Sequence, residues 1–416
     1  MFMKTSCSNT DFFWIIGGGE MQIPIIHEAR DLGLSVICSD LNIKCPCAPL
    51  VDLFFPIDIF DIDGHLRKAR EISKTHRIAG VLAAGIDAPE TMAELARFLG
   101  LLGIEPEIAR LVHNKAAFRD RLEALGFPVP RYADFGEEHL GDITALAQRI
   151  GYPLVLKNTD SSGSRGTRIF YRPNDEELRI AAAEAIRVSR SGRGLMESFW
   201  EGPEQTIETI FDVNGNFYPC FITDRLFDKR GGYALETALR HPTILSKDIQ
   251  DAMYRMAFEV ARAIGISIGA AKYDCVLTPE GPRIIEMTVR LSGGFDCQYL
   301  VPAATGKNVI RAAILTALGK PFPPELLEPK YHRVAISRSL WPQPGRIRSI
   351  SGLEKARQIP GVEKIVMRKS PGDIIEPYTD CTKRVCFVIV SAETQAEAED
   401  VLARVERTLS IDIEVV

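Results

Sequence analysis

Three features are missing from this 416-residue sequence, and each absence narrows the range of functions. The net charge is −5, so the chain lacks the basic excess that a nucleic-acid partner requires. No apolar run approaches the roughly twenty residues that span a bilayer, so we expect no membrane partner. The N-terminal apolar run is short and lacks the cleavage site of a signal peptide, so we expect a cytoplasmic protein.

Paired cysteines are also lacking. The nine cysteines are scattered, and none belongs to a CxxC motif. The closest pair, Cys45 and Cys47, has no second pair at the spacing of a zinc site. We therefore expect reduced thiols rather than disulfides or a metal centre.

Strand and helix patterns alternate along residues 12–112. Strands are predicted at 12–16, 34–40 and 78–85, and helices at 21–32 and 89–100. This alternation predicts a Rossmann-like α/β domain over residues 1–112, with a parallel sheet and helices on both faces.

The glycines at 17–19 raise a dinucleotide-binding alternative. Asp40 ends the second predicted strand, where a ribose-binding acid would stand. The fingerprint is incomplete, because Gln22 occupies the position of its third glycine. We therefore favour a structural or substrate-binding role for this half over an NAD-dependent oxidoreductase.

The remaining residues predict α+β structure. Helices are predicted at 114–126, 142–150, 174–191, 248–264, 302–318, 351–358 and 394–409. Strands are predicted at 152–157, 194–200, 204–213, 216–223, 268–278 and 282–289. We expect loops at 224–245 and 290–300 to determine the substrate, and we expect at least two of Arg225, Lys229 and Arg230 to be solvated.

The predicted hairpin at 268–289 carries charged residues on otherwise apolar strands. Alternation places Lys272 and Asp274 on one face of the first strand, and Glu286, Thr288 and Arg290 on one face of the second. Two carboxylates on paired strands suit Mg²⁺, which combines one or two carboxylates with substrate phosphates. The alternative is a surface hairpin with an ordinary Glu–Arg pair, but buried acids need partners or a metal.

Two further segments suit a nucleotide. Lys157 ends a predicted strand and precedes the small residues 161–166, whose backbone N–H groups can approach phosphate oxygens. The stretch containing Glu197, Trp200 and Glu204 offers an apolar connector for adenine and a carboxylate for ribose. Alone, the first segment is more typical of an ordinary hairpin turn, and the second is equally typical of a hinge with solvated acids.

In this order, the three segments resemble the ATP-grasp superfamily of ligases, and the resemblance covers nearly the whole chain. It implies a pre-ATP-grasp domain over 1–112 and a two-lobed ATP-grasp domain over 113–325, with a mobile lid at about 150–200. It also implies a small C-terminal α+β subdomain over 326–416, similar to that of biotin-carboxylase-like members.

The resemblance assigns roles position by position. It implies ATP binding by Lys115, Lys157, Ser161, Ser162, Gly163, Ser164, Gly166, Glu197, Trp200 and Glu204. It implies metal binding by Asp274, Glu286 and Thr288, although Thr288 stands where the family usually has asparagine. Arg290 would stabilise an oxyanion, and Lys272 would either contact the acyl substrate or pair with Asp274. The substrate would also approach His241, Ser292, Gly293 and Gly294.

The implied activity is ATP- and Mg²⁺-dependent ligation. A carboxylate would be phosphorylated to an acylphosphate, and an amine from an amino acid or similar small molecule would displace the phosphate. The cofactors would be ATP and one or two Mg²⁺ ions, with Mn²⁺ as a substitute, and the family implies a homodimer. Two alternatives stay open: a biotin-carboxylase-like enzyme that activates bicarbonate, and a non-catalytic nucleotide-binding regulatory protein.

Overall fold

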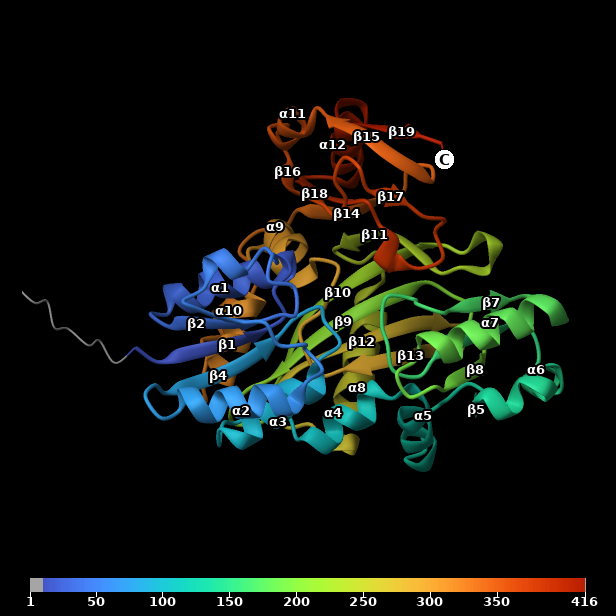
Figure 1. Ribbon diagram of the computed structural model, residues 1–416, viewed down its shortest axis with the longest axis horizontal. Coiled ribbons are helices and arrows are strands. Elements are labelled where there is room, and N and C mark those ends of the chain that lie inside the picture. Colours follow the sequence, from blue (N-terminus) through green and yellow to red (C-terminus); the bar gives the residue numbers. More distant parts are fainter. Residues whose placement is uncertain (1–9, 416) are drawn as a thin grey trace, which may run out of the picture.

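The computed structural model describes residues 10–415, which form four β-sheets and the helices that cover them (Figure 1). Cys7 and the first part of the segment tested for a signal peptide lie outside the described residues. Within residues 10–415, no helix combines the length and the hydropathy that a membrane crossing requires. The eight cysteines of this range are all free, in line with the expected lack of disulfides, and all of them are buried.

The N-terminal layer is a parallel sheet of order β3-β2-β1-β4. Its strands are β1 (Phe12–Ile16), β2 (Ser35–Ser39), β3 (Leu53–Phe55) and β4 (Ile78–Ala83). Alternation along β1 sends Phe13 and Ile15 towards α1 (Ile23–Asp31) and α10 (Val309–Ala317). It sends Phe12, Trp14 and Ile16 towards α2 (Ile62–Ile72) and α3 (Pro89–Phe98). The predicted α/β layer is present, but one of its helices, α10, comes from late in the chain (Figure 1).

The glycines of the N-terminal layer serve internal packing. The Gly18 N–H donates to a carboxylate oxygen of Asp40 at 2.8 Å, and a Cβ at Gly18 would collide with the Cys45 thiol. Gly18 therefore allows the backbone to approach the Cys45 sulfur rather than the phosphates of a dinucleotide. Asp40 binds backbone N–H groups instead of standing free for a ribose.

A small antiparallel sheet of order β5-β8-β6-β7 forms a separate unit, here called the flap (residues 132–198). Its strands are β5 (Tyr132–Phe135), β6 (Leu154–Asn158), β7 (Arg168–Phe170) and β8 (Gly194–Ser198), packed against α6 (Ile143–Ile150) and α7 (Asp175–Val188). The flap includes β5 and α6, which precede the predicted lid boundary at about 150. It lies beside the large sheet in Figure 1.

The large sheet has eight antiparallel strands in the order β13-β12-β9-β10-β11-β14-β18-β16. Its strands are β9 (Glu204–Phe211), β10 (Phe217–Asp228), β11 (Leu235–His241), β12 (Gly269–Thr278), β13 (Gly281–Thr288), β14 (Val334–Leu340), β16 (Val362–Met367) and β18 (Cys386–Ala392). Helices α4 (Pro106–His113), α5 (Lys115–Ala124) and α8 (Lys247–Ile264) bury one face of its first half. The sheet crosses the predicted boundary at 325–326, because β11 pairs with β14.

The prediction of a loop over 224–245 is wrong. Residues up to Asp228 complete β10, and residues from Leu235 form β11. Two basic residues of this segment find partners across the two strands: Arg240 pairs with Asp224 at 2.7 Å, and Arg225 with Glu236 at 2.8 Å. Such pairing is invisible until the strands are aligned.

The predicted helix over 302–318 is broken into two. A π-helical turn, η5 (Asp296–Leu300), leads into α9 (Val301–Thr305), which ends at Gly306 with φ +74°. α10 then begins after Asn308. The chain from β14 to β19 is here called the C-terminal unit (residues 334–414). Besides β14, β16 and β18, it contains α11 (Leu353–Arg357), α12 (Gln395–Thr408) and a small sheet of β15 (Gly345–Ser351), β17 (Ile374–Ile375) and β19 (Ser410–Glu414).

Candidate active site

A cavity of about 340 Å³, within the range of small-molecule sites, lies where the N-terminal layer, flap, large sheet and C-terminal unit meet. Most of the predicted site residues line it: Lys115, Lys157, Ser161, Ser162, Gly163, Ser164, Glu197, Trp200, Glu204, Lys272, Asp274, Glu286, Arg290, Gly293 and Gly294. Four predicted residues are not part of its lining: Gly166, Thr288, His241 and Ser292.

Asp274 lies on the cavity side of β12, because alternation sends its neighbours Tyr273 and Cys275 into the core. Its carboxylate pairs with Lys272 at 2.5 Å and with Arg225 at 2.9 Å, and it accepts a hydrogen bond from Thr206 at 3.0 Å. Burial alone would raise the pKa of Asp274, but the charges of Arg225 and Lys272 outweigh it and hold the pKa below its ordinary value. The group is therefore an anion at neutral pH.

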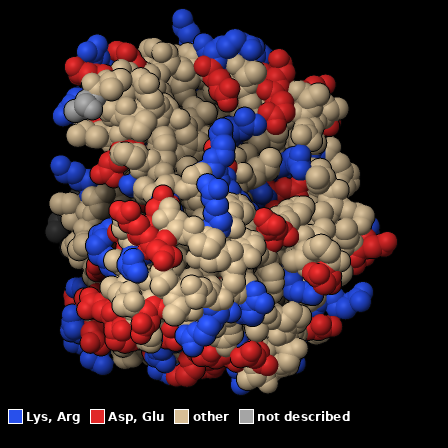
Figure 2. All heavy atoms as spheres, turned by 90° about the vertical axis from the view of Figure 1, so that its right-hand side faces the viewer, with Lys and Arg blue, Asp and Glu red and all other residues tan. Residues whose placement is uncertain are grey.

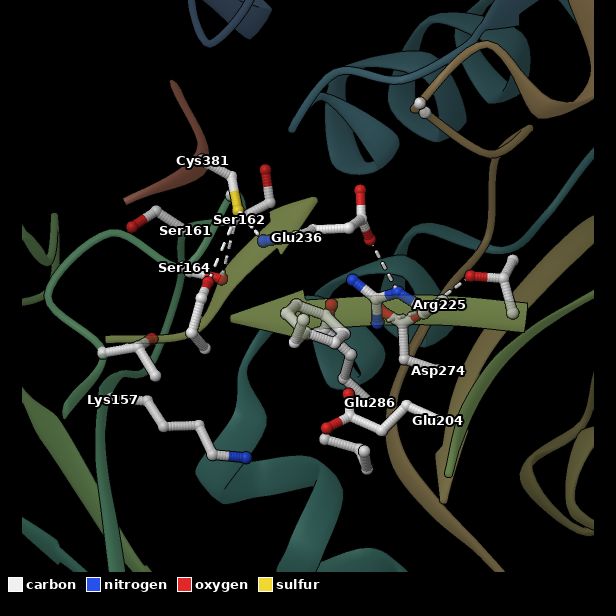
Figure 3. A pocket seen from close by; sticks show the side chains of 18 of the residues that line it. Lys157, Ser161, Ser162, Ser164, Glu204, Arg225, Glu236, Asp274, Glu286 and Cys381 are labelled. Carbon is white, nitrogen blue, oxygen red and sulfur yellow. Dashed lines mark hydrogen bonds and ion pairs between the residues drawn. The ribbon is translucent and has the colours of Figure 1, made fainter. Parts of the chain in front are cut away.

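Glu286 is the direct cross-strand neighbour of Asp274. Its only ion pair among the described residues is a long one, 3.9 Å to the Lys115 ammonium, and its side chain is 32% exposed. Two neighbouring carboxylates in one cavity form a donor set that fits a hard cation such as Mg²⁺. In residues 10–415 no three His, Cys, Asp or Glu side chains gather as metal ligands, and Thr288 adds no oxygen to the cavity lining. Figure 3 shows Asp274 and Glu286 facing the cavity opposite Lys157.

A buried ion cluster joins the flap to the large sheet. Both oxygens of Glu197 on β8 are engaged, one by Arg119 of α5 at 2.5 Å and the other by Lys157 of β6. Burial would raise the pKa of Glu197, but the charges of Arg119 and Lys157 lower it to about 2. Arg119 also donates to the Ile285 carbonyl of β13. The Glu197 side chain, predicted to bind adenine, is thus committed to two cations.

The loop 161–166, here called the lid loop, is docked on both neighbouring units. The Gly163 carbonyl accepts from the Cys381 N–H at 2.9 Å, and Arg165 pairs with Asp87 of the N-terminal layer at 2.5 Å. Lys115 donates to the Ser161 carbonyl at 2.8 Å. Gly166 serves packing rather than the cavity, since a Cβ there would collide with Val188 of α7. The lid loop therefore forms one wall of the cavity, and Figure 3 shows its serines beside Cys381.

The prediction that at least two of three basic residues are solvated is wrong. Arg225 is partly buried and pairs with Asp274 and Glu236, while Lys229 pairs with Glu204 at 2.6 Å. Only Arg230 projects into solvent, with 92% of its side chain exposed. The acids that hold Arg225 and Lys229 come from neighbouring strands, which the local sequence does not bring together.

Arg290 joins the N-terminal layer to the large sheet. Its guanidinium donates to the carbonyls of Ile86 at 3.0 Å and Leu291 at 2.9 Å. The Gly85 N–H donates to the same Leu291 carbonyl, and a Cβ at Gly85, whose φ is +62°, would crowd Gly293. The glycine therefore allows the close approach that builds this corner of the cavity.

Ser292 and His241 lie behind the cavity wall. The Ser292 N–H donates to Glu208 at 2.9 Å, and Ser292 is fully buried. His241 forms a hydrogen bond between Nδ1 and the Ile222 carbonyl at 3.0 Å, and burial lowers its pKa to about 4. The structure does not bring His241 to the cavity, because β11, which was predicted to be a loop, turns it into the sheet core.

The sequence analysis did not predict five residues that line the cavity: Arg119, Glu236, Asp296, Arg368 and Arg384. Glu236 pairs with Arg225 and with Arg384 of the C-terminal unit, each at 2.8 Å. The Arg368 guanidinium has no hydrogen bond or ion pair within the described part of the chain. No local motif marks these residues, because distant segments bring them together.

Comparisons with known proteins agree with this geometry. Residues 114–324 match the family model described as the carbamoyl-phosphate synthase L chain, ATP binding domain, and residues 338–414 match the L-amino acid ligase C-terminal domain 2. Carnosine synthase 1 of Gallus gallus is 26% identical over 328 residues, which are 74% of this chain and 35% of that protein. This chain therefore spans about a third of that relative.

Solved structures share the fold. The L-amino acid ligase from Bacillus licheniformis superposes with a TM-score of 0.81 at 23% identity, covering 97% of this chain and 99% of that one. The biotin carboxylase domain dimer of Hydrogenobacter thermophilus 2-oxoglutarate carboxylase, in complex with MgADP, ADP and bicarbonate, gives a TM-score of 0.73 at 20% identity, covering 97% and 91%. With half of the sequence matched by the ATP-binding family model, the chain belongs to the ATP-grasp superfamily of ligases, in which ATP activates a carboxylate for attack by an amine or a related nucleophile.

Proposed function

We propose that this enzyme activates the carboxylate of an amino acid, or a similar small acid, and joins it to the amine of a second small molecule. The observation that carries the proposal is the pairing of Asp274 with Glu286 across β12 and β13, in one cavity with Lys115 and Lys157. Anionic oxygens on one side and ammonium groups on the other suit a metal–triphosphate unit. The match of the C-terminal unit to L-amino acid ligases favours amino acids over bicarbonate as the substrate.

Asp274 and Glu286 would hold one Mg²⁺ ion, or Mn²⁺ in its place. When bound, the ion would neutralise charge on the nucleotide phosphates. We propose one ion rather than two, because Thr288 does not join the cavity lining. Lys115, Lys157 and the backbone of the lid loop would hold the phosphates, and Trp200 and Glu204 would flank the nucleoside.

The chain's own residues would perform three tasks around the reacting carboxylate. Lys272 and Arg290 would orient it towards the terminal phosphate of ATP. The N–H groups of Gly293 and Gly294, with Arg290, would stabilise the oxyanion that forms when the amine attacks the acylphosphate. The docked lid loop would exclude water, which would otherwise hydrolyse that intermediate. Figure 2 shows a short row of Lys and Arg side chains near the centre of the face that carries the flap, with acidic side chains on both sides of it.

The test is amino-acid-dependent ATP consumption. Pairs of amino acids are incubated with ATP and Mg²⁺, and both phosphate release and the amide product, identified by its mass, are measured. We expect turnover that EDTA abolishes and that Mg²⁺ or Mn²⁺ restores, because the carboxylate pair holds the ion. Turnover only with bicarbonate and free biotin would identify a biotin carboxylase. Tight ATP binding without turnover by any acid would identify a regulatory protein.

Arg368 is the residue we propose for the carboxylate of an amino acid acceptor, since its guanidinium lines the cavity without a hydrogen bond or ion pair to any residue between 10 and 415. Arg368→Ala is expected to raise the KM for the acceptor about 10- to 100-fold, the size of a lost charge-assisted hydrogen bond, with little change in the KM for ATP. The matched control is Arg230→Ala, which removes an exposed guanidinium and should leave both constants unchanged. An equal rise in both KM values would contradict the assignment.

The remaining assignments extend the same proposal. We propose that residues 1–112, 113–325 and 326–416 act as three functional domains, and that the flap is the part that moves. A homodimer and a cytoplasmic location are inferred for this enzyme, and sedimentation of the purified chain tests the dimer.

A further inference from the structure

Asp296 is a buried carboxylate in the lining of the cavity. The residue is 2% exposed, and its Oδ1 atom has no hydrogen-bond partner within residues 10–415. Its neighbours in the same lining are satisfied: Asp274, Glu204 and Glu236 each contact a basic side chain at 2.5–2.9 Å. A buried carboxylate is costly without a cation or a donor, so this position indicates a missing positive group.

The backbone holds Asp296 in place through a sparsely populated conformation. Phe295, immediately before it, has φ 68° and ψ 22°, in the left-handed region that bulky residues rarely adopt. The Phe295 ring is buried against Tyr299 and Phe387, and Asp296 begins the π-helical turn. Left-handed non-glycine residues and π-helical turns persist where packing enforces them, often at functional sites.

The charges around Asp296 place it beside the ion pairs of Asp274. Lys272 on β12 and Arg225 on β10 attract it, and both of these also pair with Asp274. Glu236 on β11 and Glu208 on β9 repel it. Burial, followed by these two acids, raises the pKa of Asp296 well above its ordinary value, which brings it closer to the pKa of an amine. An entering ammonium would supply the missing cation and favour the ionised carboxylate.

We propose that Asp296 binds the ammonium group of the acceptor and takes the proton that this group loses before it attacks the acylphosphate. The proposal rests on the ligase function proposed above. One N–H bond breaks and its proton passes to the Asp296 carboxylate. The nitrogen lone pair then forms the C–N bond as the bond between the acyl carbon and the phosphate oxygen breaks. A second proton from nitrogen leaves with the phosphate as hydrogen phosphate, so the amide forms without an oxidant or reductant.

The experiment separates acyl activation from amine attack. Asp296→Asn is assayed with a natural amino-acid acceptor and, separately, with hydroxylamine, which is largely unprotonated at neutral pH and needs no base to attack an acylphosphate. We expect amide formation to fall about 10²- to 10⁴-fold, the range of general-base catalysis, and hydroxamate formation to stay within about threefold. Amide formation by the variant should also recover as pH rises through the pKa of the free acceptor amine.

Two controls accompany the assay. Glu280→Gln changes an acid in the turn between β12 and β13, outside the cavity lining, and should alter neither product. Asp296→Ser is assayed in parallel, so the test does not depend on the folding of one variant, and hydroxamate formation itself reports a folded activation site.

Several results would overturn the proposal. An equal loss of amide and hydroxamate would show that Asp296 supports the structure of the site rather than the amine. Unchanged amide formation would show that no proton passes to it. The absence of ATP-dependent hydroxamate from the unchanged enzyme with every acid would overturn the ligase function itself, and the Asp296 proposal with it.

Discussion

Asp274→Asn is expected to lower ATP-dependent product formation about 10³-fold, which corresponds to about 4 kcal/mol in the activation barrier. Asparagine keeps the shape of the side chain and one oxygen, but it removes the charge that would hold the metal ion. It also leaves the ammonium of Lys272, 2.5 Å away, without its anion. Initial rates of phosphate release at saturating Mg²⁺ measure the effect.

The matched control for this change is again Glu280→Gln, which lies at the turn of the same hairpin. Its rate should stay within about twofold of the unchanged enzyme, because surface substitutions away from a site have small effects. A rate for Asp274→Asn within tenfold of the unchanged enzyme would show that this carboxylate is not a metal ligand.

Glu197→Gln is expected to destabilise the enzyme by about 3–5 kcal/mol, the range for breaking a buried ion pair at one partner. The substitution leaves the buried charges of Arg119 and Lys157 without an anion between the flap and α5. Urea unfolding followed by circular dichroism measures the change. Glu184→Gln is the matched control, because Glu184 forms an exposed ion pair with Arg187 on the same flap. That variant should unfold at the midpoint of the unchanged enzyme.

The effect of Glu197 on stability should depend on pH in a defined direction. The pKa of Glu197 is lowered from 4.5 to about 2, so its contribution is complete above the unfolded pKa and is lost as pH falls towards the folded one. The difference in unfolding free energy between the unchanged enzyme and Glu197→Gln should therefore shrink between about pH 5 and pH 2. A difference that stayed constant across this window would mean that the Glu197 carboxylate is not the titrating partner of the cluster.

Local sequence patterns were sufficient to predict the strands whose apolar residues alternate or form a short continuous run. Alternation along 268–289 predicted a hairpin with Asp274 and Glu286 on neighbouring strands, and the structure pairs these two residues directly. The apolar run at 12–16 predicted the first strand of a parallel sheet, and β1 has those bounds. In the hairpin, residues close in sequence determine the geometry, so a period of two is enough to predict it; in β1, the short continuous apolar run marks the strand.

The rest depended on contacts between distant segments. Glu236 meets Arg384 across 148 positions, and Arg119 meets Glu197 across 78. Neither acid has a local feature that distinguishes it from a solvated charge. α10 follows β13 in the chain but packs on the N-terminal sheet, and no pattern within 302–318 indicates this contact. The position of Asp296 in the cavity wall depends on the left-handed Phe295 and on the π-helical turn, and neither feature has a local sequence signal.

The pairing of β11 with β14 limits how this chain can be recombined with its relatives. An exchange of the C-terminal segment at residue 326 would replace β14 and its pairing with β11, for example at Leu239 and Ser337. If the new strand did not pair, β11 would become an exposed edge strand that can bind strands of other molecules. Hybrid ligases built on this scaffold should therefore carry both strands from the same parent.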